Sequence, residues 1–296
     1  MTAARLVFVH GRAQEGKDAI ALKAEWIAAW RKGLDKSGLT LPLADGDVRF
    51  PYYGDTLAAL VDGSGPVPDV VVRGTDPASE DEQRFQQAVL EEVMAVAGIT
   101  DAQVDAVLDD DVRQRGPLNW EWVQGILVAI DNLVPGASGA SIALATRDVY
   151  QYLRNPGVRR IIDDGVRQAM LPGVPTVVVA HSLGTVVAYN LLRREGAAAG
   201  WNVPLFVTLG SPLGVKAIRQ SVAPISHPSC VDRWFNAMDE RDVVALYPLD
   251  STRFDVTPPI RNKTDVRNHT RNRHGIDGYL DDAEVARCIR TEFAGP

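Results

Sequence analysis

Short, unbroken apolar runs that lead directly into helical stretches recur near both ends of this chain of 296 residues. Residues 6–9 (LVFV) and 176–180 (TVVVA) are such runs, and they suit strands that are buried on both faces of a parallel sheet. Residues 17–32 and 183–194 follow them and are predicted to be helices. Strands that alternate with helices imply right-handed βαβ units. The sequence therefore predicts an α/β fold with a mostly parallel central sheet and helices on both faces.

Three more segments are predicted to be strands, namely residues 48–50, 205–209 and 231–237. Near the carboxyl end, Asp281 and Glu284 have the spacing of a capping box, with Asp281 as the N-cap of a last helix. The α/β pattern therefore continues to the end of the chain.

Residues 55–146, in the middle of the chain, lack this pattern, because no run there is typical of a buried strand. Residues 85–96 have the apolar spacing of a helix, as do residues 149–170, where the stripe is interrupted near Pro156. We therefore expect a single domain over residues 1–296, with a helical insertion or lid in its middle third.

Composition excludes several classes of protein. Hydrophobic residues make up 46% and charged residues 23%, which excludes a wholly disordered chain. The formal net charge of −7 argues against nucleic acid as the main partner, because phosphate binding needs a basic surface. The longest apolar segment, residues 125–145, contains Asp131 and Pro135 and is a poor candidate for a membrane span. The first apolar run is too short for a signal peptide, so a cytoplasmic protein is expected.

The two cysteines, Cys230 and Cys288, form no CxxC pair and no cluster with histidine at zinc-binding spacing. A chain of this length buries enough surface to fold without a disulfide or a metal. We expect reduced thiols, with a disulfide as the alternative, and neither a metal site nor a cofactor.

Residues 180–184 (AHSLG) have the form small-x-Ser-x-Gly. In a nucleophile elbow, a serine occupies a sharp strand-to-helix turn, and small residues two before and two after it let strand and helix approach. Ser138 and Ser141 also fit the relaxed form, but no predicted strand precedes them. Ser182 follows a predicted strand and opens a predicted helix, so it is the candidate nucleophile. The alternative is a serine that only caps the helix.

A serine hydroxyl needs a histidine base, and the histidine needs a carboxylate that fixes its tautomer. In folds with this elbow, the chain order is serine, acid, histidine. Asp242 follows the predicted strand at residues 231–237 and precedes apolar residues that can hold it buried. It is therefore the candidate acid, with Asp239 as the alternative.

His274 is the candidate base, because it lies on the loop before the last predicted helix. His269, five residues earlier in a polar run, is the alternative. His227 precedes both candidate acids and so breaks the expected order.

An oxyanion on the attacked carbonyl needs preorganised N–H donors. We predict that these are the backbone N–H groups of Leu183, after the nucleophile, and of Arg12, in the loop after the first strand. Ala13 is the alternative to Arg12. His10 ends the first strand, and we expect it to brace that loop rather than to transfer protons.

Together these motifs resemble those of α/β-hydrolase-fold serine hydrolases of the lipase/esterase type. The matching pieces are residues 8–11 (FVHG), 180–184, 208–212 (TLGSP) and the segments around Asp242 and His274. The resemblance implies hydrolysis of a carboxylic ester of a small-molecule substrate through an acyl-enzyme. It does not cover residues 55–146, and Ala180 stands where many relatives have glycine. The alternatives are an amidase or peptidase with the same triad and a catalytically silent binding protein of the same fold.

Clues to the substrate are fewer. His10, Tyr53 and His181 are candidate substrate contacts, although Tyr53 equally suits packing. Residues 120–134 are rich in apolar side chains and either form an acyl pocket or lid or pack the insertion against the sheet. A basic cluster precedes His274 and either attracts an anionic group or forms a solvated face. Its members are Arg261, Lys263, Arg267, Arg271 and Arg273.

Overall fold

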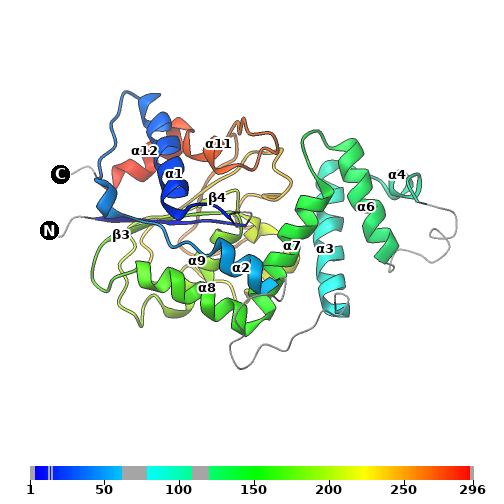
Figure 1. Ribbon diagram of the computed structural model, residues 1–296, viewed down its shortest axis with the longest axis horizontal. Helices are drawn as coiled ribbons and strands as arrows, with labels where there is room; N and C mark the ends of the chain where they lie inside the picture. Colours follow the sequence, from blue (N-terminus) through cyan, green and yellow to red (C-terminus); the bar gives the residue numbers. More distant parts are fainter. Residues whose placement is uncertain (1–3, 13, 15, 62–78, 109–119, 294–296) are drawn as a thin grey trace.

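The computed structural model describes residues 4–12, 14, 16–61, 79–108 and 120–293 of the chain. Within these ranges, six parallel strands form one sheet in the order β2-β1-β3-β4-β5-β6 (Figure 1). Their bounds are Arg5–Val9 (β1), Val48–Arg49 (β2), Thr176–His181 (β3), Phe206–Leu209 (β4), Trp234–Ala237 (β5) and Arg261–Lys263 (β6). The predicted α/β fold class is confirmed.

The strand β6 is the one that sequence analysis did not predict. Its residues, Arg261–Lys263 (RNK), are polar and partly exposed. An edge strand has a neighbour on one side only, so it needs no apolar run to be stable. Here the guanidinium of Arg261 lies over the ring of Phe235 on β5, 4.3 Å from its centre, and covers it in place of an apolar side chain.

Side chains of each inner strand alternate between two hydrophobic cores, one on each face of the sheet. Leu6 and Phe8 of β1 belong to one core, and Val7 and Val9 belong to the other. Successive side chains of a strand point to opposite faces, so a strand with helices over both faces must be apolar throughout. This requirement explains the unbroken apolar run at residues 6–9.

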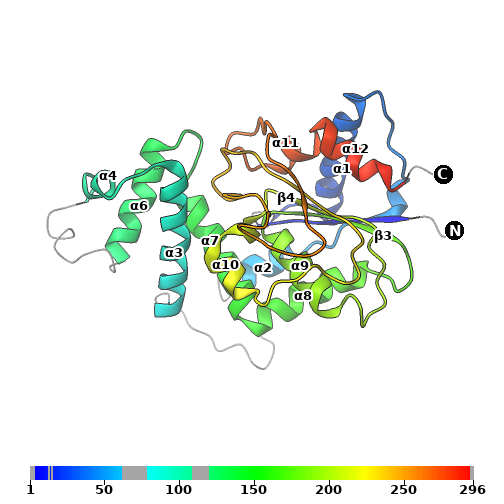
Figure 2. The ribbon, with the colours of Figure 1, turned by 180° about the vertical axis from the view of Figure 1, so that it is seen from behind.

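Helices cover both faces of the sheet (Figures 1 and 2). The helix between β1 and β2 lies on the same face as the last two helices of the chain, and it packs against both. These three are α1 (Ala19–Asp35), α11 (Ile276–Leu280) and α12 (Ala283–Thr291). The opposite face is covered chiefly by α2 (Gly54–Val61), α8 (Pro156–Ala169) and α9 (Leu183–Glu195).

The described residues between β2 and β3 form helices and no strand. Besides α2 and α8, these helices are α3 (Glu80–Ala97), α4 (Asp101–Asp105), α6 (Trp120–Leu133) and α7 (Gly139–Arg154). Figure 1 shows that α3, α4 and α6 stand beyond one end of the sheet, while α7 joins them to α8 and α9. Figure 2 shows the short helix α10 (Lys216–Ser221) beside α3.

The strand order reverses direction between β1 and β3. From β1 the chain passes through α1 to β2 on one side, whereas β3, β4, β5 and β6 follow in order on the other side. In open α/β sheets, the crossovers on either side of such a switch point diverge and leave a crevice at the carboxyl ends of the strands. The segments that follow β1 and β3 therefore meet where a ligand site is expected.

The last helix begins one residue later than the capping box predicts. Asp282, not Asp281, is the N-cap of α12, and its carboxylate accepts the N–H of Glu284 at 2.9 Å. The carboxylate of Asp281 instead lies 3.2 Å from the ammonium of Lys36, which follows α1. Asp281 therefore pairs with Lys36 at the end of α1, and its neighbour Asp282 caps the last helix.

Cys230 and Cys288 are both free thiols, and Cys230 is buried. Within the described ranges, we find no helix with the length and apolarity that crossing a membrane requires.

A buried carboxyl group joins α7, α8 and α9. Asp163 of α8 accepts the hydroxyl of Tyr152 at 2.8 Å, and that hydroxyl accepts the side-chain amide of Asn190 at 3.2 Å. Burial raises the pKa of Asp163 to about 6 from 3.8, although the Tyr152 hydroxyl and Arg194 act in the opposite direction. A carboxyl group whose pKa is raised by folding destabilises the fold increasingly as pH rises from about 4 to about 6.

We predict that Asp163→Asn raises the free energy of unfolding at pH 7.5 by roughly 1–3 kcal/mol. The amide is neutral, and its oxygen can still accept the Tyr152 hydroxyl. The gain is expected to disappear at pH 4, where the wild-type carboxyl group is protonated in the fold. Thermal unfolding of both proteins between pH 4 and pH 8 measures it. A variant that is less stable than the wild type at pH 7.5 contradicts the prediction.

Candidate active site

Ser182 occupies the turn between β3 and α9, where its backbone has φ 55° and ψ −130°. Positive φ at a non-glycine residue is uncommon and costs on the order of 1–3 kcal/mol. The flanking elements hold this conformation: the Ser182 N–H donates to the carbonyl of Leu209 on β4 at 3.1 Å, and the Ser182 carbonyl accepts the N–H of Thr185 at 2.9 Å. The sequence-predicted strand-to-helix turn is thus present, with a strained serine at its apex.

Glycines let this turn approach β1 closely. A Cβ atom at Gly184 would lie 2.4 Å from the carbonyl oxygen of Val9 and 2.5 Å from that of His10. A Cβ atom at Gly11 would lie 2.8 Å from the Cβ of Ser182. Both contacts are too short for any side chain, so these two positions bring the loop after β1 next to the serine.

His274 reaches Ser182 from the loop before α11. Its Nε2 lies 2.8 Å from the Oγ of Ser182, and its Nδ1 lies 2.7 Å from the Oδ2 of Asp242. A carboxylate can only accept, so Nδ1 carries a proton, and Nε2 is free to accept the serine hydroxyl proton. The structure thus brings the predicted nucleophile, base and acid together in the tautomer that a general base needs.

Asp242 is buried, and four hydrogen-bond donors surround its carboxylate. Its Oδ1 accepts the N–H groups of Val244 at 2.8 Å and Ala245 at 3.3 Å. Its Oδ2 accepts Nδ1–H of His274 and the hydroxyl of Tyr279, the latter at 2.6 Å. Burial alone would raise the pKa of Asp242, but His274 and the hydrogen bonds outweigh it and hold the pKa below its usual value. A buried anion at this position stabilises a protonated His274.

The alternative acid and bases have other surroundings. Asp239 is buried, but its Oδ2 accepts the backbone N–H of Asn268 at 2.8 Å, so it joins the acid loop to the loop that carries His274. The side chain of His269 is 61% exposed. His227 packs beside Trp234 of β5, with the ring centres 6.0 Å apart. Of the three histidines considered as the base, His274 is the one that contacts Ser182.

His10 and Tyr53 interlock behind the loop after β1. The N–H of Tyr53 donates to Nε2 of His10 at 3.0 Å, and Nδ1–H of His10 donates to the carbonyl of Gly11 at 2.6 Å. The hydroxyl of Tyr53 donates to the His10 carbonyl. Burial lowers the pKa of His10 to about 4, so the ring is neutral at pH 7. Neither residue lines the pocket beside Ser182, and this placement favours bracing over the predicted contact with substrate.

His181 lies directly before the serine and also faces the protein. Its Nε2–H donates to the backbone carbonyl of His274 at 2.7 Å, and the two rings lie 4.7 Å apart. Burial, followed by the proximity of His274, lowers the pKa of His181 to about 3. A neutral His181 therefore tethers the backbone of His274, which is a different role from the predicted contact with substrate.

The predicted oxyanion donors belong to residues that border the same pocket as Ser182. Leu183 is the first residue of α9, and N–H groups in the first turn of a helix have no acceptor within it. Arg12 follows Gly11, and its Nε lies 2.7 Å from the carboxylate of Asp148 on α7. This ion pair ties the loop after β1 to α7. The alternative donor, Ala13, lies outside the described residues.

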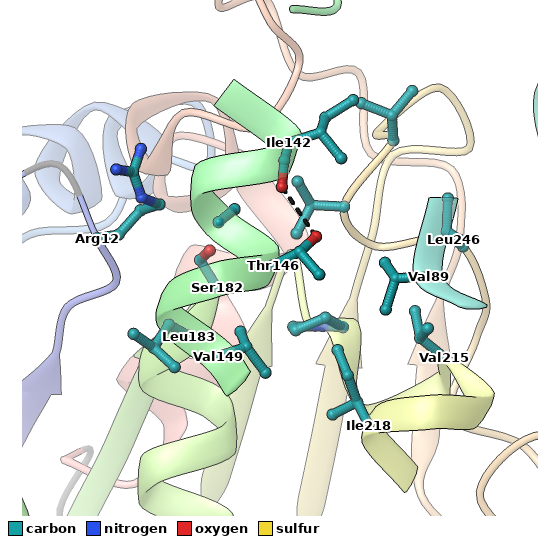
Figure 3. Close-up of a pocket in the computed structure, with 14 residues that line it drawn as sticks. Arg12, Val89, Ile142, Thr146, Val149, Ser182, Leu183, Val215, Ile218 and Leu246 are labelled. Atoms are coloured by element: carbon teal, nitrogen blue, oxygen red, sulfur yellow. Dashed lines mark hydrogen bonds between the residues drawn. The ribbon is translucent and has the colours of Figure 1, made fainter. Parts of the chain in front are cut away.

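An apolar pocket opens beside Ser182 (Figure 3). Its cavity volume is about 30 Å³, so in this structure it is a narrow apolar slot that opens to solvent. Its walls come from α3, α7, α10 and the loop after Asp242. In Figure 3, apolar side chains lie on the side of Ser182 away from Arg12. They include Val89, Ile142, Val215, Ile218 and Leu246.

Sequence analysis predicted a helix over residues 149–170, which includes the end of α7, but it did not identify α7 as a wall of this pocket. Residues 120–134 include α6, which packs against α3, α4 and α7, and no residue of α6 lines the pocket among those described. Ile142 and Val149 of α7 line it instead, and their seven-residue spacing was the available signal. The serines that resemble the elbow motif lie at the start of α7, with Ser138 as its N-cap.

Two members of the basic cluster are engaged on β6. The ammonium of Lys263 lies 2.7 Å from the carboxylate of Asp265, and Arg261 stacks on the ring of Phe235. The other three members lie on the loop before His274 and are exposed or half-buried. This arrangement favours a solvated face over a preformed anion site.

Comparisons of the chain with protein-family models, with curated proteins and with solved structures found no match. In the part of the chain that the structure describes, no group of three or more His, Cys, Asp and Glu side chains could hold a metal ion. The geometry around Ser182 is therefore the basis for assigning a function.

We predict that Gly184→Ala destabilises the fold by about 2 kcal/mol or more, because the added Cβ meets two rigid backbone carbonyls. Gly165→Ala on α8 is the matched control. A Cβ there meets no atom within 4 Å, so this variant is expected to gain about 0.5–1 kcal/mol. Denaturant unfolding of both variants measures the difference. Equal stability of the two variants would show that the close approach at Gly184 is unimportant.

Proposed function

We propose that this chain is an α/β-hydrolase-type serine hydrolase that cleaves carboxylic esters. The observation that carries the proposal is the continuous hydrogen-bond chain from Ser182 through His274 to Asp242, with lengths of 2.8 and 2.7 Å. Its position at the switch point of a parallel sheet is compatible with this fold type. The apolar pocket beside the serine supports a small-molecule acyl substrate.

In the acylation step, the Oγ of Ser182 attacks the ester carbonyl carbon while its proton moves to Nε2 of His274. The carbonyl oxygen becomes an oxyanion, and the backbone N–H groups of Leu183 and Arg12 are its donors. Asp242 stabilises the imidazolium that results. When the tetrahedral intermediate collapses, the bond to the alcohol oxygen breaks, and His274 gives its proton to the departing alkoxide. An acyl-serine remains.

In the deacylation step, water takes the place of the alcohol. His274 accepts a proton from the water as the water oxygen attacks the acyl-serine carbonyl. Collapse of the second tetrahedral intermediate breaks the bond to Oγ, and the proton returns from His274 to Ser182. The products are a carboxylic acid and the free enzyme, and the residues named are sufficient for both steps without a cofactor.

The direct test is Ser182→Ala, assayed with short-chain p-nitrophenyl esters. Loss of the nucleophile is expected to lower kcat by a factor on the order of 10⁴–10⁶. A fluorophosphonate probe is expected to label the wild-type protein at Ser182 and to leave the variant unlabelled. If Ser182→Ala hydrolyses the esters as fast as the wild type, the proposal is wrong. If neither activity nor labelling is found, a binding protein of the same fold is favoured.

The pocket leads to a second prediction, about the acyl group. Ile218→Trp is expected to fill the far side of the pocket and to lower kcat/KM for a p-nitrophenyl octanoate about tenfold, while the acetate is unaffected. Ile20→Trp, at a position that is 79% exposed, controls for the added indole. Equal losses for both esters, or none for either, would place the acyl group elsewhere. Matched p-nitroanilides in the same series measure any amidase activity.

A further inference from the structure

Tyr279 of α11 is a fully buried tyrosine whose hydroxyl ends in the acid loop. The hydroxyl donates its one proton to the Oδ2 of Asp242 at 2.6 Å, and its oxygen accepts the backbone N–H of Asp239 at 3.3 Å. A phenol has a single proton to donate, and this arrangement directs it at the carboxylate. Sequence analysis gave no role to this residue.

The oxygen that accepts the Tyr279 hydroxyl also accepts Nδ1–H of His274. Two donors on Oδ2, together with two backbone N–H groups on Oδ1, restrain the carboxylate of Asp242 against rotation about its Cβ–Cγ bond. Without the tyrosine, the histidine would be the one remaining donor on Oδ2 among the residues that the structure describes. Tyr279, which is not a member of the triad, therefore helps to fix the orientation of the Oδ2 atom that accepts Nδ1–H of His274.

The hydroxyl keeps its proton throughout the range in which an esterase works. Burial, followed by the charge of Asp242, raises the pKa of Tyr279 well above its usual value. The ring of Tyr279 also packs closely against Gly210, where φ is 55°. A Cβ atom at this glycine would lie 3.0 Å from the Cε2 of Tyr279 and 3.1 Å from the Cε1 of His274. Glycine at the end of β4 thus lets both rings pack against the strand.

We propose that Tyr279 is a positioning residue of the hydrolase, which holds the carboxylate of Asp242 in the orientation that His274 requires and withdraws part of its negative charge. The inference rests on the proposed function. Tyr279 acts through Asp242 and does not line the pocket, so it affects proton transfer and not the binding of the acyl group.

Two effects follow from loss of the hydroxyl. A carboxylate that can rotate holds the imidazole less well, which lowers the rates of the proton transfers through His274. A carboxylate with one donor fewer presents more negative charge to His274 and favours its protonated form. The ionisable groups that face His274 are Asp242 from the acid loop, His181 from β3 and Tyr279 from α11. His181 is neutral, so the change at Asp242 governs the effect.

The test is Tyr279→Phe, assayed with p-nitrophenyl acetate across pH 5–9. We expect kcat to fall about tenfold with KM unchanged, because a hydrogen bond to a charged group is lost without any change in the pocket. The acid limb of the kcat profile is expected to move to higher pH. In proton NMR spectra, which need no substrate, the downfield signal of His274 Nδ1–H is expected to change its position, because the carboxylate that accepts this proton has lost its other side-chain donor.

Two variants separate positioning from structural support. Tyr152→Phe removes a hydroxyl that is equally buried and hydrogen-bonded to a carboxylate, but far from the triad in sequence and on another helix. It is expected to lower the melting temperature and to leave kcat and the pH profile unchanged. Incorporation of 3-fluorotyrosine at position 279 keeps the packing and makes the hydroxyl a stronger donor, so the acid limb should move to lower pH.

The inference is overturned if Tyr279→Phe loses stability as the control does but keeps the wild-type kcat, pH profile and Nδ1–H signal. If Tyr279→Phe fails to fold, an acid limb that is unchanged with 3-fluorotyrosine overturns it as well. Failure of the proposed function has a different signature: the Ser182→Ala protein then retains the wild-type rate. In that case the NMR signal still shows whether Tyr279 controls the Asp242–His274 contact.

Discussion

The close approach of the β3–α9 turn to the end of β1 is the contact on which the rest of the site depends. Gly184 packs against the carbonyls of Val9 and His10, and Gly11 packs against Ser182. These contacts place the strained serine beside the loop that carries Arg12. Backbone strain of this kind persists only where the surroundings hold it, and here two inner strands and a buried helix do so.

A parallel sheet explains how distant segments reach this serine. All strands end at the same edge, so the loops after β1, β3, β5 and β6 converge on the switch point. Asp242 lies on the loop after β5 and His274 on the loop after β6, and a hydrogen bond between Asp239 and Asn268 joins the two loops. Two of the helices between β2 and β3, α3 and α7, supply apolar side chains to the pocket at this edge.

The positions of Ser182, Asp242 and His274 could be predicted because local sequence patterns indicate them. The elbow is a contiguous motif, and the order serine, acid, histidine limits the choice of Asp242 and His274. The sequence also indicates that His10 braces the loop after β1, but the roles of Tyr53 and His181 could not be predicted in this way. Only packing decides whether such a ring faces the pocket or the protein, and the rings of all three residues make their contacts within the protein and do not line the pocket. Tyr279 lies near His274 in sequence, yet nothing in the pattern indicates its contact with Asp242.

By itself, the sequence determined the α/β class, the inner strands and the serine turn, because unbroken apolar runs and small residues around a serine have few other solutions. Only the tertiary structure decided which helix lines the pocket, which aspartate caps α12 and how Asp242 is surrounded. These outcomes depend on contacts between segments far apart in the chain. Such contacts are selected by shape and by the need to pair every buried polar group, and neither is visible in the spacing of residues.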